Sequence, residues 1–163
     1  MRFDEQFTAV ALAIIVIVGV FAVSQSVLAR RVVEPFSELG VLGPNLKLGD
    51  YPKQLVVGWP YDLYLYLGNH EGRVMYYRVL IKVGDQTQNV SDTEPLEAPV
   101  MDYYEAILPH EGNQTLPVVI SVSEQGVNRR MVFELHAYDN DAGGFVYLGQ
   151  WCQLWFNATG PSG

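Results

Sequence analysis

The chain has 163 residues, of which 49% are hydrophobic and 17% charged, and its formal net charge is −8. This length is enough for one domain of ordinary size. The acidic balance argues against a nucleic-acid partner, because a phosphate-binding surface needs clustered lysine and arginine. The single cysteine, Cys152, leaves no intrachain disulfide and no cysteine-based zinc site.

The first element along the chain is an uncharged stretch from Phe7 to Ala29. As a helix this stretch spans about 34 Å, enough to cross a hydrocarbon core of about 30 Å. We predict a retained transmembrane helix in an N-terminal segment, residues 1–31. The alternative is a cleaved signal peptide, since Val27-Leu28-Ala29 fits a small-residue cleavage pattern. The start of the chain is not basic, however, and the apolar run is longer than usual for a signal peptide.

Small residues form one stripe on this predicted helix, at Gly19, Ala22 and Ser26. Small side chains let helices approach closely in lipid, so the stripe predicts packing against another membrane subunit. Apolar helices contain many small residues, so such a stripe also arises by chance.

The remaining residues, 32–163, are predicted to form an extracytoplasmic domain. Arg30 and Arg31 alone would favour a cytoplasmic location by the positive-inside rule. Three N-x-[ST] sequons favour the opposite side and predict N-linked glycans, at Asn89, Asn113 and Asn157. From Val32 onward, 7 Lys plus Arg and 16 Asp plus Glu give a net charge of 7 − 16 = −9. That balance predicts a solvated acidic exterior without a polybasic lipid-binding patch.

This domain is predicted to be mainly β. Leu63, Leu65 and Leu67 alternate with more polar residues, the period of a half-buried strand. Seven such strands are predicted, at residues 36–42, 61–67, 73–83, 103–108, 116–123, 129–138 and 145–156. We expect two hairpins, one closed by the turn 68–72 and one by the turn 124–128. The sequence therefore predicts an antiparallel, immunoglobulin-like β-sandwich of about seven strands behind one transmembrane helix.

Aromatic side chains supply the candidate contact surface, formed by Tyr64, Tyr66, Trp151 and Trp155. The two tryptophans are four residues apart on one predicted strand and therefore share a face, with Cys152 as a buried thiol on the other. Such residues build cores, or surfaces that contact proteins or sugars. Core packing is the first interpretation and a contact surface the second.

No catalytic, cofactor or metal site is predicted. His70, His110 and His136 lack a spacing that places two ligands on one face. The stretch 139–144 alternates oxygen ligands as a calcium loop does, but an Asx-rich hairpin turn is the favoured interpretation. No nucleophile elbow or phosphate-binding glycine loop is present.

One part of the chain resembles the archaeal DUF1616 family: Glu34-Pro-Phe-Ser-Glu-Leu-Gly-Val-Leu-Gly-Pro44, then Asp50-Tyr-Pro52, Val57-Gly58 and Gly68-Asn-His-Glu-Gly72. The resemblance covers residues 34–83 and implies an archaeal membrane protein with an outward β-domain. Family members often carry several transmembrane helices, and this chain has one. The resemblance supplies no enzymatic activity. The same spacing is similar to immunoglobulin-like adhesion modules, in which Gly58 would open a strand and Asn69 would take a left-handed turn conformation.

These observations favour a non-enzymatic, single-pass surface protein, a glycosylated accessory or structural subunit of a larger archaeal membrane or envelope complex. Its expected partners are membrane lipid and other subunits. One alternative is a subunit of a pilus or thread-like filament, whose processed chain would begin at the apolar run. The other is a carbohydrate- or solute-binding surface domain, which requires an exposed groove lined by tyrosine or tryptophan.

Overall fold

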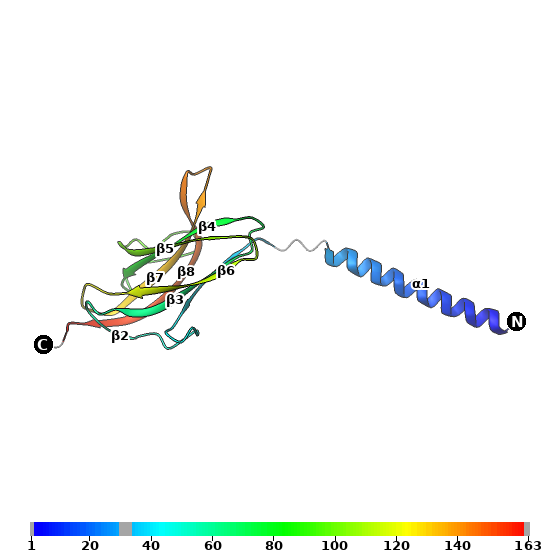
Figure 1. The fold of residues 1–163 in the computed structure, drawn as a ribbon, viewed down its shortest axis with the longest axis horizontal. Coiled ribbons are helices and arrows are strands. Elements are labelled where there is room, and N and C mark those ends of the chain that lie inside the picture. The colour runs from blue at the N-terminus through cyan, green and yellow to red at the C-terminus, as the bar shows by residue number, and fades with distance from the viewer. Residues whose placement is uncertain (1, 30–33, 162–163) are drawn as a thin grey trace. The chain divides into compact units, whose positions relative to one another are not determined.

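The computed structural model describes residues 2–29 and 34–161, and the side chains of residues 7–25 and 34–161. The chain divides into two compact units after Glu34, a helix and a β-domain. In Figure 1 the helix is blue and the strands of the β-domain run from cyan to red.

The helix α1 spans Arg2–Ala29, so it contains the whole predicted stretch Phe7–Ala29 and begins before it. Its segment Phe7–Gln25 has a mean hydropathy of 2.7 and is long and apolar enough to cross a membrane. Ser24 Oγ donates to the main-chain oxygen of Val20 at 2.7 Å, so this hydroxyl is satisfied inside the helix. Gly19 and Ala22 are exposed, whereas the side chain of Ser26 lies outside the described residues.

Within residues 34–161 the β-domain has eight strands in chain order: β1 Ser37–Leu42, β2 Gln54–Val56, β3 Tyr61–Asn69, β4 Met75–Gly84, β5 Val100–Leu108, β6 Asn113–Ile120, β7 Gly126–Asp139 and β8 Gly144–Thr159. They make a three-stranded sheet of order β1-β3-β6 and a five-stranded sheet of order β2-β8-β7-β4-β5. The pairs are antiparallel except β2 with β8, which is parallel. The predicted β-sandwich is confirmed, with one strand more than expected.

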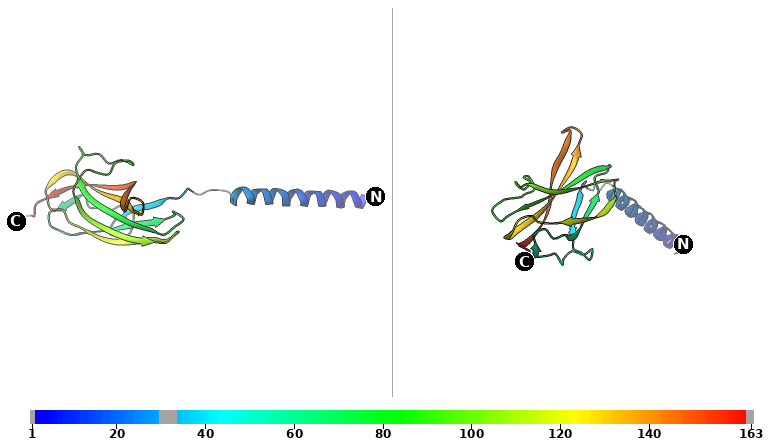
Figure 2. Two further views of the ribbon diagram at one scale, coloured as in Figure 1. Left: turned by 90° about the horizontal axis from the view of Figure 1, so that it is seen from above. Right: turned by 60° about the vertical axis from the view of Figure 1, so that its left-hand side comes forward.

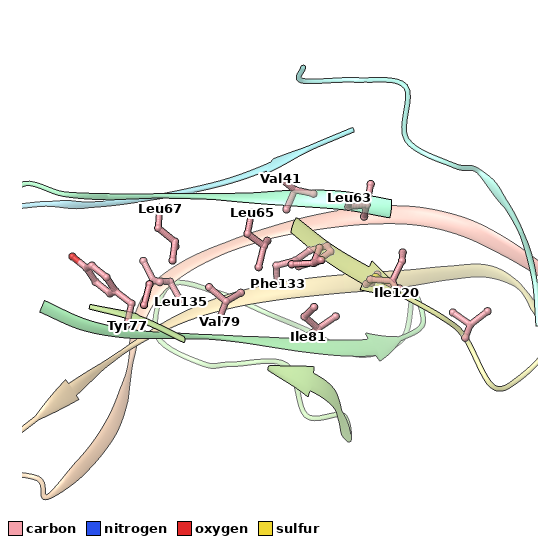
Figure 3. Close-up of a cluster of buried hydrophobic side chains, with 14 of the residues drawn as sticks. Val41, Leu63, Leu65, Leu67, Tyr77, Val79, Ile81, Ile120, Phe133 and Leu135 are labelled. Atoms are coloured by element: carbon pink, nitrogen blue, oxygen red, sulfur yellow. The ribbon is translucent and has the colours of Figure 1, made fainter. Parts of the chain in front are cut away.

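The core lies between the two sheets because the strands alternate buried and half-exposed residues. On β3 the predicted set Leu63, Leu65 and Leu67 is fully buried. On the facing sheet β4 contributes Val79 and Ile81. Figure 3 shows these side chains pointing toward one another across the gap, joined by Phe133 and Leu135 from β7.

The two predicted hairpins are wrong. β3 pairs with β1 and β6, whereas β4 pairs with β5 and β7, so the turn at 68–72 crosses between the sheets. The turn at 124–128 likewise joins strands of different sheets, β6 and β7. Loop length alone does not distinguish these arrangements, because a short connection can close a hairpin or lead to the other layer of a sandwich.

The last two strands form one long hairpin, in which Asp139 pairs with Gly144. Its tip stands clear of the other strands in Figure 1 and in the right-hand view of Figure 2. The predicted Asx turn is present there, since Asp139 Oδ1 accepts hydrogen bonds from the N–H groups of Asp141 and Ala142.

Candidate functional site

A groove of about 520 Å³ lies at the seam where β1 of one sheet meets β8 of the other. Its lining residues are Ser37, Glu38, Leu39, Tyr66, Gly149, Gln150 and Trp151. This volume is in the range of small-ligand sites, roughly 300–1,000 Å³. We call this feature the seam groove.

The seam groove unites two of the four predicted contact residues, Tyr66 and Trp151, which come from different sheets. Tyr64 lies on the outer face of the three-stranded sheet, opposite Pro117 in register, and is not part of the groove lining. Trp155 lies on the five-stranded sheet and is 41% exposed. The four residues therefore do not form one continuous surface.

Tyr66 is held in place by its neighbours on β1. It lies opposite Gly40 in register, and its ring packs over the site that a side chain at Gly40 would occupy. The Tyr66 hydroxyl donates to Glu38 Oε2 at 3.1 Å. Burial, and then this bond to a carboxylate, raise the pKa of Tyr66. The tyrosine thus remains a neutral donor at physiological pH.

A β-bulge shapes the opposite wall. The register of β7 and β8 shifts between Leu135 and His136, and Gly149 in β8 has a φ of 71°. A Cβ at Gly149 would lie 2.3 Å from the main-chain oxygen of Asp92. The loop 85–99 therefore packs directly on the bulge, and only glycine permits that approach.

Cys152 lies on the inner side of β8, opposite in direction to the tryptophans as predicted. It is half-buried rather than fully buried, and its Sγ lies 3.6 Å from the main-chain oxygen of Leu39 as a donor. Burial raises the pKa of this thiol, which keeps it protonated. The thiol thus contacts the free edge of β1, and the sequence did not predict this contact.

The turn Gly68–Gly72 of the resemblance is a structural junction. Asn69 is fully buried at the end of β3, and its Nδ2 donates to the main-chain oxygens of Arg73 and Leu108, both at 2.8 Å. Its Oδ1 accepts from the N–H of Glu71. The left-handed conformation expected for Asn69 is wrong, whereas Gly58 does have a φ of 81° but lies between strands instead of opening one.

Two of the three histidines meet beside this junction. His70 stacks on Phe36, with ring centroids 4.5 Å apart, and its Nδ1 lies 3.1 Å from Glu111 Oε2. The hydrogen bond with Glu111 is the largest cause that raises the pKa of His70, opposed by burial and assisted by Glu38. His110 Nδ1 accepts from the N–H of Gly72.

His136 lies elsewhere, on β7, and belongs to a buried ionic cluster that the sequence did not reveal. Lys82 Nζ lies 2.9 Å from Glu134 Oε2, and His136 Nε2 lies 3.4 Å from the same oxygen. Burial raises the pKa of Glu134, but hydrogen bonds from His136, Lys82 and the Leu96 N–H outweigh it and leave the pKa lowered. Within the described residues, no three His, Cys, Asp or Glu side chains are grouped to hold a metal ion.

The loop 85–99 covers this cluster. Leu96 is 1% exposed; its main-chain oxygen accepts from Lys82 Nζ at 2.8 Å and its N–H donates to Glu134 at 2.5 Å. The Tyr147 hydroxyl donates to the oxygen of Ser91, and burial raises the pKa of Tyr147 to about 12. The cluster therefore fastens the loop to the outer face of the five-stranded sheet.

The three sequon asparagines differ in accessibility. Asn89 is exposed in the loop 85–99, and Asn113 is exposed at the first position of β6. Asn157 is half-buried in β8, where it pairs with Gln54 of β2 and its Oδ1 accepts from the Asn128 N–H at 2.8 Å. Asn89 and Asn113 are thus the better placed acceptors.

Solved structures with a similar arrangement share little sequence with this chain. The CARDB domain of a Pyrococcus furiosus protein, crystallised in complex with di-metal ions, is 8% identical with a TM-score of 0.47, over 78% of this chain and 90% of that one. Spo0M, a sporulation control protein from Bacillus subtilis, is 7% identical with a TM-score of 0.46, over 75% and 49%.

A β-glucosidase from Listeria innocua in complex with glucose is 9% identical with a TM-score of 0.45, over 76% of this chain and 16% of the enzyme. The chain thus spans about one-sixth of that enzyme's length. None of the curated proteins matches the sequence.

One protein family matches most of the chain. The family described as "Domain of unknown function (DUF1616)" aligns with residues 31–144. This match extends well past Val83, where the resemblance in the sequence ends, and includes all of β5, β6 and β7. The chain belongs to the DUF1616 family.

Proposed function

We propose that this chain is a non-enzymatic, single-pass surface protein of an archaeal cell membrane, with its β-domain outside the cell. The observation that carries the proposal is the segment Phe7–Gln25, apolar, long enough to span a bilayer and 0% buried within the structure. An exposed apolar surface of this size needs lipid or a partner to cover it. The sandwich that follows has its own closed core.

Alkaline extraction of native membranes tests the anchor. The full chain is expected to stay in the membrane pellet. The double variant Ile15→Lys/Val18→Lys is expected to be lost from the pellet, because charges near the centre of a spanning helix cost about 2.5–3.5 kcal/mol each. Ile15→Leu/Val18→Leu is the matched control and should remain. Release of the unaltered chain by alkali would contradict the anchor.

The role we assign to the protein is that of a glycosylated accessory or structural subunit. A non-enzymatic role is supported by the groups that line the seam groove, which include two aromatic rings and one carboxylate, Glu38. Such a set suits recognition of a partner better than hydrolysis. Glycoside hydrolysis, for comparison, normally uses two carboxylates. Purification in mild detergent, with intact-mass analysis of every co-eluting chain, is expected to yield stoichiometric partner subunits. The mass of the N-terminus also separates this role from a filament subunit, which would begin at the apolar run.

A second candidate function is carbohydrate binding, and the seam groove is the observation that favours it. Tyr66 and Trp151 offer ring faces for a sugar, while Glu38 and Gln150 offer hydrogen-bonding groups. Titration with neutral oligosaccharides, followed by tryptophan fluorescence, tests this candidate. Tyr66→Ala, which keeps Trp151 as the fluorescent reporter, should abolish any saturable change, and Trp59→Ala, at an exposed position outside the groove lining, should not.

A further inference from the structure

The free edges of a β-sandwich are sites where another strand can pair, and most edges of this domain carry protection. On β6, the N–H of Val119 points off the edge to the Tyr104 hydroxyl at 3.3 Å. Pro117, two residues earlier, has the same orientation and no N–H to offer. On β5, Asp102 Oδ1 accepts from the Tyr103 N–H at 2.8 Å.

The edge of β1 is also satisfied from within the domain. The main-chain oxygen of Val41 accepts from the Tyr51 hydroxyl at 2.7 Å. That of Leu39 lies against Cys152 Sγ. These side-chain contacts occupy groups that a further strand would need, as the contacts on β5 and β6 do.

The main-chain groups in the middle of β8 lack such protection, although Cys152 in this stretch contacts β1 through its side chain. One edge of β8 pairs with β7, and the other pairs with β2 only from Asn157 to Thr159. The Asn157 N–H donates to the main-chain oxygen of Lys53, so the N–H of this residue points away from β7. The direction of the main-chain hydrogen-bonding groups alternates along a strand. The N–H and C=O groups of Trp151, Gln153 and Trp155 therefore also point away from β7. No backbone partner is recorded for them on that side among the described residues.

The chemistry of β8 also favours association. Its 16 residues, from Gly144 to Thr159, contain no charged side chain, although the sequence from Val32 onward carries a net charge of −9 (7 Lys plus Arg, 16 Asp plus Glu). Two copies of so acidic a domain repel each other, and contact through an uncharged strand adds the least local repulsion. The outer side chain Trp155 is 41% exposed, and tryptophan is a preferred anchor in protein interfaces.

We propose that two copies of this chain pair antiparallel along residues 150–156 of β8, about a two-fold axis at Gln153. This stretch is limited by the Gly149 bulge at one end and by the β2 pairing at Asn157 at the other. Gln153 is its centre. The two five-stranded sheets then join into one continuous sheet across the axis.

The sequence of the stretch is symmetric in the way that such an axis requires. Trp151-Cys-Gln-Leu-Trp155 places each tryptophan opposite the other tryptophan of the second copy, and Gln153 opposite its own equivalent. Each directly opposed pair with this orientation exchanges two main-chain hydrogen bonds. Aromatic pairs across neighbouring strands add about 0.2–1 kcal/mol each. A second copy of the chain therefore pairs with the free edge of β8 better than a strand of unrelated sequence does.

The seam groove gives the second copy room. Trp151 lines this groove, and its volume of about 520 Å³ offers space for the side chain of the partner's Trp155, which the proposed register places opposite Trp151. Anchoring by α1, as proposed above, would confine the copies to one surface and raise their effective concentration. The pairing itself concerns only the β-domain and goes beyond the anchored role.

The full chain in mild detergent tests the proposal by sedimentation velocity over a range of protein concentrations. We expect a reversible dimer. Gln153→Lys puts two like charges directly opposite each other in the dimer and should weaken association at least tenfold. Gln114→Lys, the same substitution at an exposed position of β6, keeps the Asn113 sequon intact; it is the matched control and should leave the dimer unchanged. Equal circular dichroism spectra and melting temperatures would show that both variants fold.

Thiol cross-linking in native membranes tests the axis, in a Cys152→Ser background. Gln153→Cys is expected to give a cross-linked dimer of this chain, at least tenfold more than Val119→Cys on the protected β6 edge. Three results would overturn the proposal: a monomer at all concentrations, a dimer insensitive to Gln153→Lys, or cross-links from position 153 to a different protein. None of them bears on whether the helix anchors the chain, so the two proposals fail independently.

Discussion

Asn69 at the end of β3 donates a hydrogen bond of 2.8 Å to the main-chain oxygen of Leu108 at the end of β5, 39 residues further along the chain. This bond crosses from one sheet to the other. The backbone of Asn69 also bonds to the turn between β5 and β6. Its N–H donates to the main-chain oxygen of Gly112, and its main-chain oxygen accepts from the N–H of Glu111. One buried residue thus fixes, through its side chain and its backbone, two turns that carry the sequence His-Glu-Gly.

Replacing Asn69 by Ala should lower the free energy of unfolding by about 2–4 kcal/mol. The change leaves the buried oxygen of Leu108 and that of Arg73 without donors and opens a small cavity. Chemical denaturation of the full chain measures the effect. Asn69→Asp, which keeps the acceptor but loses both donors, should be similarly destabilised. A loss below 0.5 kcal/mol for both variants would refute the junction.

Gly149→Ala should destabilise the β-domain by about 1–3 kcal/mol, because the new methyl group needs a strained φ and meets the oxygen of Asp92. Hydrogen exchange should rise throughout the loop 85–99, which packs on the bulge. Gly144→Ala, with open space around its Cβ position, is the control and should change little. Unchanged exchange in the loop would mean that Gly149 does not position it.

The Lys82–Glu134 pair should behave as a buried ion pair in a double-mutant cycle. Lys82→Met alone and Glu134→Leu alone should each cost about 3–5 kcal/mol, because each leaves a buried charge without its partner. The double variant should be less destabilised than the sum of the two single variants. Additive losses, measured by denaturant unfolding, would show that the two side chains are not coupled.

His70 makes a pH-dependent contribution. Its pKa in the folded domain is raised above the ordinary 6.5, so its contribution to stability is full below pH 6.5 and is lost as the pH rises through the raised value. Glu111→Gln removes the largest cause and should bring the His70 pKa down toward 6.5. Imidazole NMR titration measures it, with the resonance assigned from His70→Gln. A pKa that Glu111→Gln does not move would contradict the hydrogen bond.

Glycosylation should be unequal among the three sequons. In the native host, Asn89→Gln and Asn113→Gln are each expected to remove one glycan mass from the intact protein. Asn157→Gln should remove none, since Asn157 is half-buried between β2 and β7. A glycan found on Asn157 alone would reverse this order, and it would require local opening of β8.

Local pattern predicted the strands well but not their partners. The alternation of Leu63, Leu65 and Leu67 placed β3 correctly, because one face of each strand must be buried. The turn at 68–72 was misassigned to a hairpin, because the contact that decides its path is with Leu108, far along the chain. A short turn carries no information about which sheet the next strand joins.

The candidate site was partly predictable for the same reason. For Tyr66 and Trp151 the sequence predicts core packing first and a contact surface second, whereas both are half-buried in the structure. Their meeting in one groove depends on the packing of β1 against β8. The buried pair Lys82 and Glu134 was missed, since alternation places both on the solvent side of the sheet. Only the loop 85–99, folded back over them, makes that position buried.

The central claim is that one helix holds an outward β-domain at the membrane, and labelling of intact cells tests it most directly. In a Cys152→Ser background, cysteine is introduced at Val127, which is 80% exposed in the β-domain, or at Gln6, which precedes the apolar segment. A membrane-impermeant maleimide is expected to label the Val127→Cys protein in intact cells and the Gln6→Cys protein only after lysis. The reverse pattern would contradict the account.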